Sequence, residues 1–232
     1  MLNWAARYLP IVRVLRQHLN ETDSILEIGS GSVGLGKFYR AAFVGCDVAF
    51  AVKPQPPMFP VMATAANLPF ADRSFDGVIA SDVLEHIPPG NRTSAIAEAL
   101  RVARKLVIFG FPSGNAAFDC DRKLAEVYDR RLPSRPTWLE EHICYGFPDE
   151  KLFDDFRTKW QVSSFGNESV GFHFWMMNKE MSSAWDFGFR LLMALAPGAA
   201  EGFLKRADRE PFYRRIVILR PKDPSAAALH ES

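Results

Sequence analysis

The stretch from Ile25 to Gly34, ILEIGSGSVG, combines one carboxylate with three glycines in the spacing G-x-G-x-x-G. Glycines at this spacing between a strand and a helix allow the backbone to approach a ligand closely. An acidic residue about 20 positions further on completes the fingerprint of a dinucleotide-binding loop. Asp47 stands near that offset. The spacing therefore predicts a nucleotide-like ligand and leaves its charge open.

The charge of Glu27 discriminates between two such ligands. Glu27 comes two residues before Gly29, where a dinucleotide would bring its anionic pyrophosphate toward the loop. Like charges held close together in a partly dry cleft repel by roughly several kcal/mol. S-adenosylmethionine has no phosphate and carries an ammonium group and a sulfonium centre, which Glu27 would attract. Asp47 serves either ligand, because its carboxylate can accept hydrogen bonds from a ribose diol.

Four segments carry a family resemblance: ILEIGSGSVGLGKF, VGCDVAF, ATAANLPFADRSFDGVIASDVLEHIPP and KLVIFGFP. Together they resemble the class I S-adenosylmethionine-dependent methyltransferases, a broad group that includes enzymes of quinone biosynthesis and other small-molecule enzymes. The resemblance is close from Ser24 to Pro112 and looser through EEHICYGFPDEKLFDDF and the last expected strand. It implies transfer of a methyl group to an oxygen, nitrogen or carbon nucleophile of a small or amphiphilic molecule.

The resemblance also assigns positions to the cofactor. It places four residues around the methionine part: Glu27, Gly29, Ser30 and Gly31. It places Asp47 at the ribose hydroxyls, and it places Ala65, Ala66, Asn67 and Leu68 beside the adenine. Thr64 stands where many relatives have an Asp that accepts from the adenine amino group, so its hydroxyl or nearby backbone groups would substitute. Ser81 and Asp82, at the tip of a strand, should face both cofactor and acceptor, since ligands of open parallel sheets bind outside the carboxyl ends of the strands.

Two histidines are candidates for a general base, because unperturbed histidine titrates near neutral pH. His86 lies in DVLEHIPP, where it could instead satisfy backbone carbonyls at a helix end, and His142 lies in an inserted segment that would close over the substrate. The three cysteines are far apart and lack a C-x-x-C spacing, so they predict neither a disulfide framework nor a zinc site. We assign no metal ligand from the sequence.

The expected elements that position these residues alternate between strand and helix. Apolar runs predict strands at 24–28, 43–48, 77–81 and 105–112, and helical periodicity predicts helices at 5–19, 35–40 and 91–104. This alternation predicts an α/β fold, a Rossmann-like, doubly wound, seven-stranded and mostly parallel sheet. The segment 214–222 is expected as a late antiparallel strand.

The remaining segments are expected to complete a single domain over residues 1–232. The proline-dense KPQPPMFP (53–60) predicts a loop, and 113–158 predicts an insertion or lid over the strand ends. PDEKLFDDFR (148–157) should be a helix, WQVSSFG (160–166) a strand, and 181–206 mostly helical. The tail 223–232 is expected to be frayed.

Composition limits the partners. A formal net charge of +1 gives no basic field, so we expect no nucleic-acid partner. Arg190 and Pro197 interrupt the apolar stretch 187–203, so we do not expect it to form a transmembrane helix. Its apolar residues still allow peripheral contact with a membrane and a lipid-linked acceptor. The absence of a signal-peptide pattern and the cysteine usage favour the cytoplasm.

An NAD(P)-dependent oxidoreductase and a non-catalytic cofactor-binding module remain as alternatives, and the oligomeric state is open.

Overall fold

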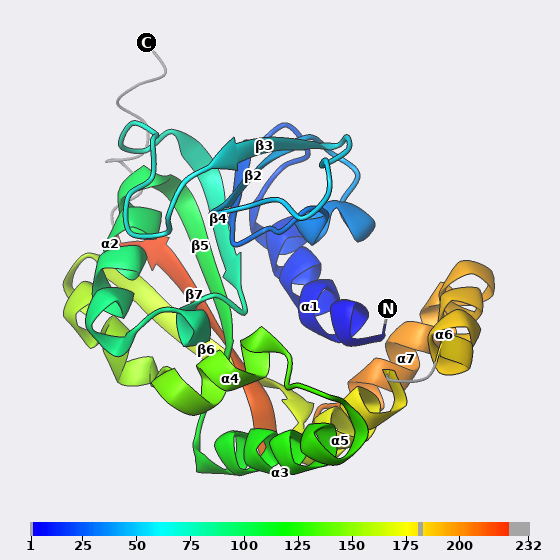
Figure 1. The fold of residues 1–232 in the computed structure, drawn as a ribbon. Coiled ribbons are helices and arrows are strands. Elements are labelled where there is room, and N and C mark those ends of the chain that lie inside the picture. The colour runs from blue at the N-terminus through cyan, green and yellow to red at the C-terminus, as the bar shows by residue number, and fades with distance from the viewer. Residues whose placement is uncertain (1, 181–182, 223–232) are drawn as a thin grey trace.

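The computed structural model describes residues 2–180 and 183–222 and contains a seven-stranded sheet in the order β3-β2-β1-β4-β5-β7-β6 (Figure 1). The strands are β1 (Ile25–Ile28), β2 (Phe43–Asp47), β3 (Met58–Met62), β4 (Phe75–Ser81), β5 (Ala103–Pro112), β6 (Trp160–Ser169) and β7 (Phe212–Pro221). The strands β1 to β5 pair in parallel, and β7 lies antiparallel between β5 and β6. The predicted fold class and the late antiparallel strand are confirmed.

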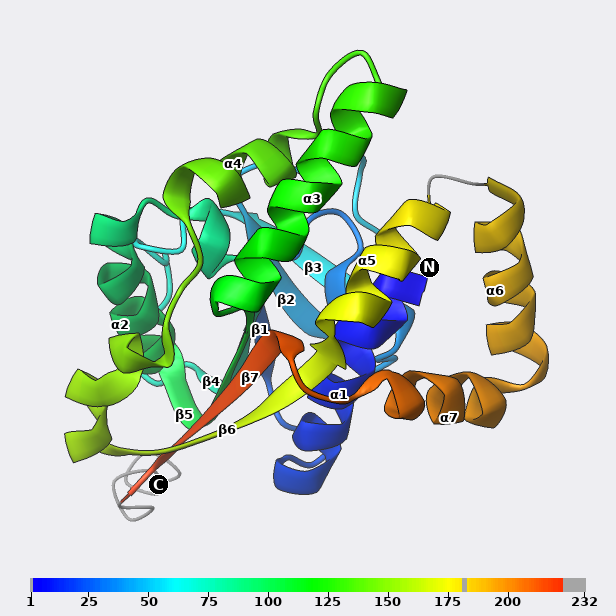
Figure 2. The same ribbon diagram turned by 90° about the horizontal axis from the view of Figure 1, so that it is seen from below.

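Helices cover both faces of this sheet (Figure 2). The α-helices are α1 (Leu2–His18), α2 (Arg92–Val102), α3 (Asn115–Arg131), α4 (Thr137–Tyr145), α5 (Val170–Glu180), α6 (Ser183–Leu195) and α7 (Pro197–Ala207). Short 3₁₀ helices are η1 (Gly34–Lys37), η2 (Leu84–His86), η3 (Pro89–Asn91) and η4 (Glu150–Thr158). The segment predicted as a lid, 113–158, thus forms mainly α3, α4 and η4.

Alternate residues of the central strands pack against opposite layers. Leu26 and Val78 join the cluster that contains α2 and η4, whereas Ile25, Ile79 and Ile108 join the cluster that contains α1. Every residue of β4 is buried, as expected for a parallel strand that is covered on both faces. The sheet interior therefore holds the strand ends, and the residues that follow them, in fixed positions.

Three expectations about local structure need correction. The predicted loop 53–60 contains the start of β3, which tolerates Pro60 because it is an edge strand paired only with β2. The predicted helices at 35–40 and 148–157 are the 3₁₀ helices η1 and η4. The helix α5 was not expected from the sequence. The predicted frayed tail, 223–232, lies outside the described residues.

The predicted helical segment at 181–206 forms α6 and α7, while residues 181 and 182 lie outside the described residues. The two helices project beside the N-terminal end of α1, away from the sheet (Figures 1 and 2). The α6 side chains of Phe187 and Leu195 are 69% and 76% exposed. Within 2–180 and 183–222, no helix combines the length and apolarity that crossing a membrane requires. Peripheral membrane contact stays a prediction.

The glycine loop after β1 is built over Glu27. Gly29, Gly31 and Gly34 all have positive φ, at 70°, 54° and 45°, a conformation that favours glycine. The Glu27 carboxylate beneath the loop accepts two hydrogen bonds. The Leu35 N–H donates one at 2.7 Å, and the hydroxyl of Tyr8 in α1 donates the other at 2.6 Å. A Cβ atom at Gly34 would overlap this carboxylate.

We predict that Gly34→Ala destabilises the protein more than Gly31→Ala. Both variants place alanine at a positive φ, which costs about 1–2 kcal/mol. A Cβ at Gly31 meets no atom within 4 Å, whereas at Gly34 it displaces Glu27, and such overpacking costs roughly 1–3 kcal/mol more. Urea unfolding of the two variants measures the difference. Equal losses in the free energy of unfolding would show that Glu27 does not support the loop.

Candidate active site

A cleft of about 550 Å³ opens at the carboxyl ends of β1, β2 and β4. Its volume is within the range of roughly 300–1,000 Å³ that is usual for small-molecule sites. The residues on its wall that the sequence analysis named are Gly29, Asp47, Thr64, Ala65, Ala66, Asp82 and His86. Glu141 of α4 also lines it, so the inserted segment reaches the cleft. The topology thus brings half of the expected site residues to the wall of one cleft.

Asp47, the last residue of β2, connects the glycine loop to the cleft. Its Oδ2 accepts a hydrogen bond from the Gly31 N–H at 2.7 Å, and its Oδ1 has a longer contact, 3.4 Å, with the Ala49 N–H. One oxygen therefore fixes the loop, and the other keeps accepting capacity for a ligand hydroxyl. The turn opposite is closed by the Asn67 N–H, which donates to the Thr64 carbonyl at 3.1 Å.

Several predicted cofactor residues do not line the cleft: Glu27, Ser30, Gly31, Asn67, Leu68 and Ser81. The Glu27 side chain is 0% exposed and both of its oxygens accept hydrogen bonds from the protein, so it can reach a ligand only through neighbouring backbone groups. Burial raises the pKa of Glu27 to about 6, against the hydrogen bonds from Tyr8 and Leu35. Glu27 therefore shapes the loop from below.

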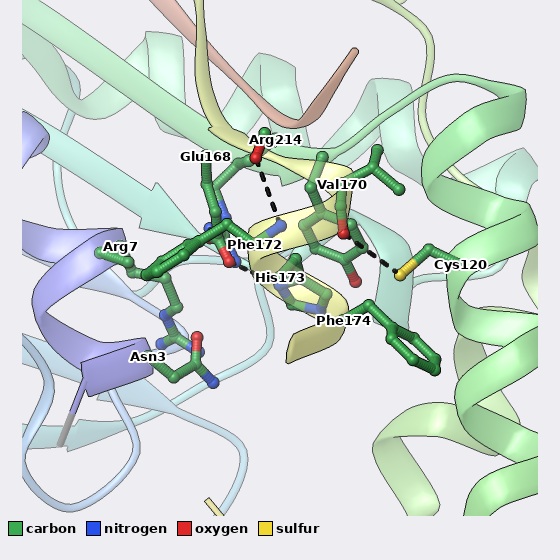
Figure 3. A network of polar contacts seen from close by, with 12 residues as sticks. Asn3, Arg7, Cys120, Glu168, Val170, Phe172, His173, Phe174 and Arg214 are labelled. Carbon is green, nitrogen blue, oxygen red and sulfur yellow. Dashed lines mark hydrogen bonds and ion pairs between the residues drawn. The ribbon is translucent and has the colours of Figure 1, made fainter. Parts of the chain in front are cut away.

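Asp82 follows β4 and belongs to a buried ionic network. Its carboxylate accepts two hydrogen bonds from Arg214, at 2.8 and 2.9 Å, and Arg7 of α1 lies 3.3 Å away. Arg214 also donates to Glu168 at 2.6 Å. Figure 3 shows Glu168, Arg214 and His173 close together beside α5. Burial would raise the pKa of Asp82, but the two guanidinium groups outweigh it and hold this pKa well below its usual range.

A second cavity, of about 600 Å³, shares Asp82 and His86 with the cleft. Its wall is aromatic and polar, and includes Tyr128, Trp138, His142, His173, Met177, Tyr213 and Arg214. The rings of His86 and His142 lie 4.9 Å apart between centroids. The two histidines that the sequence analysis named therefore meet where one cavity adjoins the other.

Each histidine of this region is paired with a carboxylate through Nδ1. His86 contacts Glu141 at 2.6 Å, His142 contacts Asp121 at 2.6 Å, and His173 contacts Glu168 at 2.8 Å. A carboxylate at Nδ1 favours the tautomer with the proton there and leaves Nε2 as the acceptor. Burial, followed by the neighbouring His142, lowers the pKa of His86.

Sequence reasoning missed Glu85, Asp121, Glu168 and Arg214. Glu85 precedes His86 in η2 and is fully buried. Burial, followed by the negative charge of Asp82, raises its pKa well above the usual value. The signal available in the sequence was a carboxylate next to a candidate histidine. The other three residues come from distant segments and carry no motif.

The buried Glu27 predicts a specific pH dependence. Its pKa in the folded protein, about 6, exceeds its usual value of 4.5, so its contribution to stability is present below pH 4.5 and is lost as pH rises through 6. We predict that Glu27→Gln gains about 2 kcal/mol relative to the wild type between pH 4.5 and 7. Urea unfolding of both proteins across this range measures the difference, and a pH-independent difference would contradict the prediction.

Part of the chain matches a known protein family, and the fold is shared with solved structures. Residues 26–110 match the family model described as a methyltransferase domain. No curated protein matches the chain in sequence. Magnesium protoporphyrin IX methyltransferase (ChlM) from Synechocystis PCC 6803, solved with bound SAH, has a TM-score of 0.51 at 14% identity, over 92% of this chain and 81% of that one.

Two further solved structures share the fold. A protein assigned as a methyltransferase of an antibiotic biosynthesis pathway from Anabaena variabilis has a TM-score of 0.51 at 17% identity, over 91% of this chain and 98% of that one. The small RNA methyltransferase HEN1 has a TM-score of 0.52 at 13% identity, over 93% of this chain and 25% of that one. Residues 26–110 thus match a methyltransferase domain, and the chain shares its fold with methyltransferases of known structure, one of which was solved with bound SAH.

Proposed function

We propose that S-adenosylmethionine binds in the cleft with its ribose hydroxyls on Asp47 and its adenine beside Thr64, Ala65 and Ala66. The cleft fits this group, because the two alanines have small side chains on its wall and Asp47 offers a carboxylate oxygen to a diol. The observation that carries the proposal is this gathering of the glycine loop, Asp47 and the 64–66 turn around one cleft. Glu27 would affect cofactor binding through the conformation of the glycine loop.

The acceptor would occupy the second cavity. This cavity meets the cleft at Asp82 and His86, so a nucleophile held there lies next to the cofactor site. When bound, S-adenosylmethionine supplies a methyl group on a positively charged sulfur. The chain aligns the two ligands, and alignment can supply much of the rate of such a transfer.

The residues on the wall of the second cavity support a proposal about the class of acceptor. Tyr128, Trp138 and Tyr213 offer aromatic faces to a flat or apolar body. His86 and His142 stand at the shared wall, where a protonated nucleophile would need activation. We therefore favour a small molecule with a hydroxyl group on a flat apolar body over a nitrogen or carbon acceptor. In the reaction the hydroxyl gives its proton to one of these imidazoles, its oxygen bonds to the methyl carbon, and the carbon–sulfur bond breaks with its electron pair left on sulfur.

The cofactor half of the proposal predicts that Asp47→Ala weakens binding of S-adenosylhomocysteine. Loss of charge-assisted hydrogen bonds worth about 1.5–3 kcal/mol reduces affinity roughly 10- to 100-fold. Calorimetric titration measures this, with the exposed Asp154→Ala in η4 as the matched control. Unchanged affinity in Asp47→Ala would count against the site, and binding of NADH in a parallel titration would favour the oxidoreductase.

The acceptor half predicts a split between kinetic parameters. Trp138 lines the second cavity but not the cleft. With any acceptor found in a panel of hydroxylated aromatic compounds, Trp138→Ala should raise the KM for that acceptor about tenfold and leave the KM for S-adenosylmethionine unchanged. Trp185→Ala, on the surface of α6, is the control. An equal effect on both KM values would place the acceptor elsewhere, and methylated nitrogen or carbon in the product would correct the acceptor class.

A further inference from the structure

Glu85, His86 and His142 form a cluster at the wall between the two cavities. One ligand atom from each, a carboxylate oxygen or an imidazole nitrogen, lies within 4.8 Å of the other two. Glu85 and His86 belong to η2, directly after β4, and His142 belongs to α4, which packs against η2. The fold thus brings together three potential metal ligands that are separated in sequence.

Two members of the cluster have buried potential ligand atoms that lack a hydrogen-bond partner. Glu85 is 0% exposed and neither of its carboxylate oxygens has a partner; His142 is 5% exposed and its Nε2 has none. The His142 Nε2 lies 4.0 Å from Glu85 Oε1, which is too long for a hydrogen bond. Leaving such groups unpaired in the protein interior is unfavourable. A cation between them would satisfy both, since two ligands that are each about 2.1 Å from one ion lie about 3–4 Å apart.

The surrounding residues orient the two imidazoles as ligands. Asp121 accepts from His142 Nδ1 at 2.6 Å and also from the Tyr213 hydroxyl at 3.0 Å. Glu141 contacts His86 Nδ1 at 2.6 Å. Metal-binding histidines usually donate their second nitrogen to a carboxylate, which fixes the ring and the tautomer. Both histidines have this arrangement, so each Nε2 has its lone pair available.

We propose that Glu85, His86 and His142 bind one divalent transition-metal ion whose remaining coordination positions face the acceptor. Two imidazole nitrogens and one carboxylate are typical ligands of Zn²⁺, Mn²⁺, Fe²⁺ and Co²⁺, whereas Mg²⁺ and Ca²⁺ prefer oxygen. His86 lines both cavities and His142 lines the second, so positions opposite the three protein ligands are accessible to an acceptor oxygen.

Bound metal would change how the acceptor is activated. A metal ion lowers the pKa of a hydroxyl that it binds, and the proton then leaves to water without an imidazole base. Nitrogen atoms that ligate metal cannot also accept a proton, so ligation replaces the general-base role predicted for the two histidines. Activation of the acceptor by the metal ion rests on the proposed acceptor site, whereas binding of the metal ion does not.

The test uses the full chain without an affinity tag, after treatment with a chelator and dialysis. Titration with Co²⁺, followed by visible absorption, should show one ion per chain with micromolar or tighter affinity. Zn²⁺ should compete, and Mg²⁺ should not. His142→Ala and Glu85→Gln should each weaken Co²⁺ binding about 100-fold, and His18→Ala, an exposed histidine on α1, should bind as the wild type does.

Binding of S-adenosylhomocysteine to the same variants separates the two proposals. Retained S-adenosylhomocysteine binding with no Co²⁺ binding up to millimolar concentration would overturn the metal site and leave the proposed function intact. Co²⁺ binding that persists unchanged in both His142→Ala and Glu85→Gln would also overturn it, because the ion would then lie elsewhere. If Glu85→Gln alone is folded by circular dichroism, the comparison with His18→Ala still decides the question.

Discussion

The contact of the buried Arg214 with two carboxylates, the buried Glu168 and the partly buried Asp82, fixes the geometry on which both cavities depend. Arg214 lies near the start of β7, Asp82 follows β4, and Glu168 lies near the end of β6. A guanidinium group stays charged in proteins and has five donors, so its burial requires fixed acceptors on more than one side. The antiparallel insertion of β7 between β5 and β6 satisfies this requirement. The ends of these strands therefore cannot shift independently of the wall between the cavities.

The neighbouring residue on β7 extends this control to the histidines. Tyr213 stacks on His173 with ring centroids 3.4 Å apart and donates its hydroxyl to Asp121. Asp121 in turn holds His142. One short segment of β7 thus positions Asp82 through a guanidinium group and His142 through a hydroxyl group. The polar residues near the acceptor cavity form connected networks, in which each bond limits the freedom of the next.

The sequence was most informative where function depends on local backbone conformation. The glycine loop, Asp47 at the end of β2 and the 64–66 turn were found by spacing and by resemblance, and the structure places them around one cleft. The charge of Glu27 suggested a role at the cofactor, but the sequence does not show that its partner is Tyr8, which lies 19 residues away on α1. Arg214 and Asp82 are 132 residues apart. Hydrophobic periodicity reports which face of an element is buried, and carries no information about which distant polar residue meets it.

Asp82 and Glu85 show how the same fold gives opposite properties to two nearby carboxylates. Both lie in the segment after β4, but Arg7 and Arg214 surround Asp82, whereas Glu85 has no hydrogen-bond partner among the described residues. The guanidinium groups lower the pKa of Asp82 against the effect of burial, and burial raises that of Glu85. Paired environments of this kind commonly separate the roles of two carboxylates in an active site. Asp82 is therefore suited to maintaining the wall, and Glu85 is the carboxylate with free capacity to bind a cation.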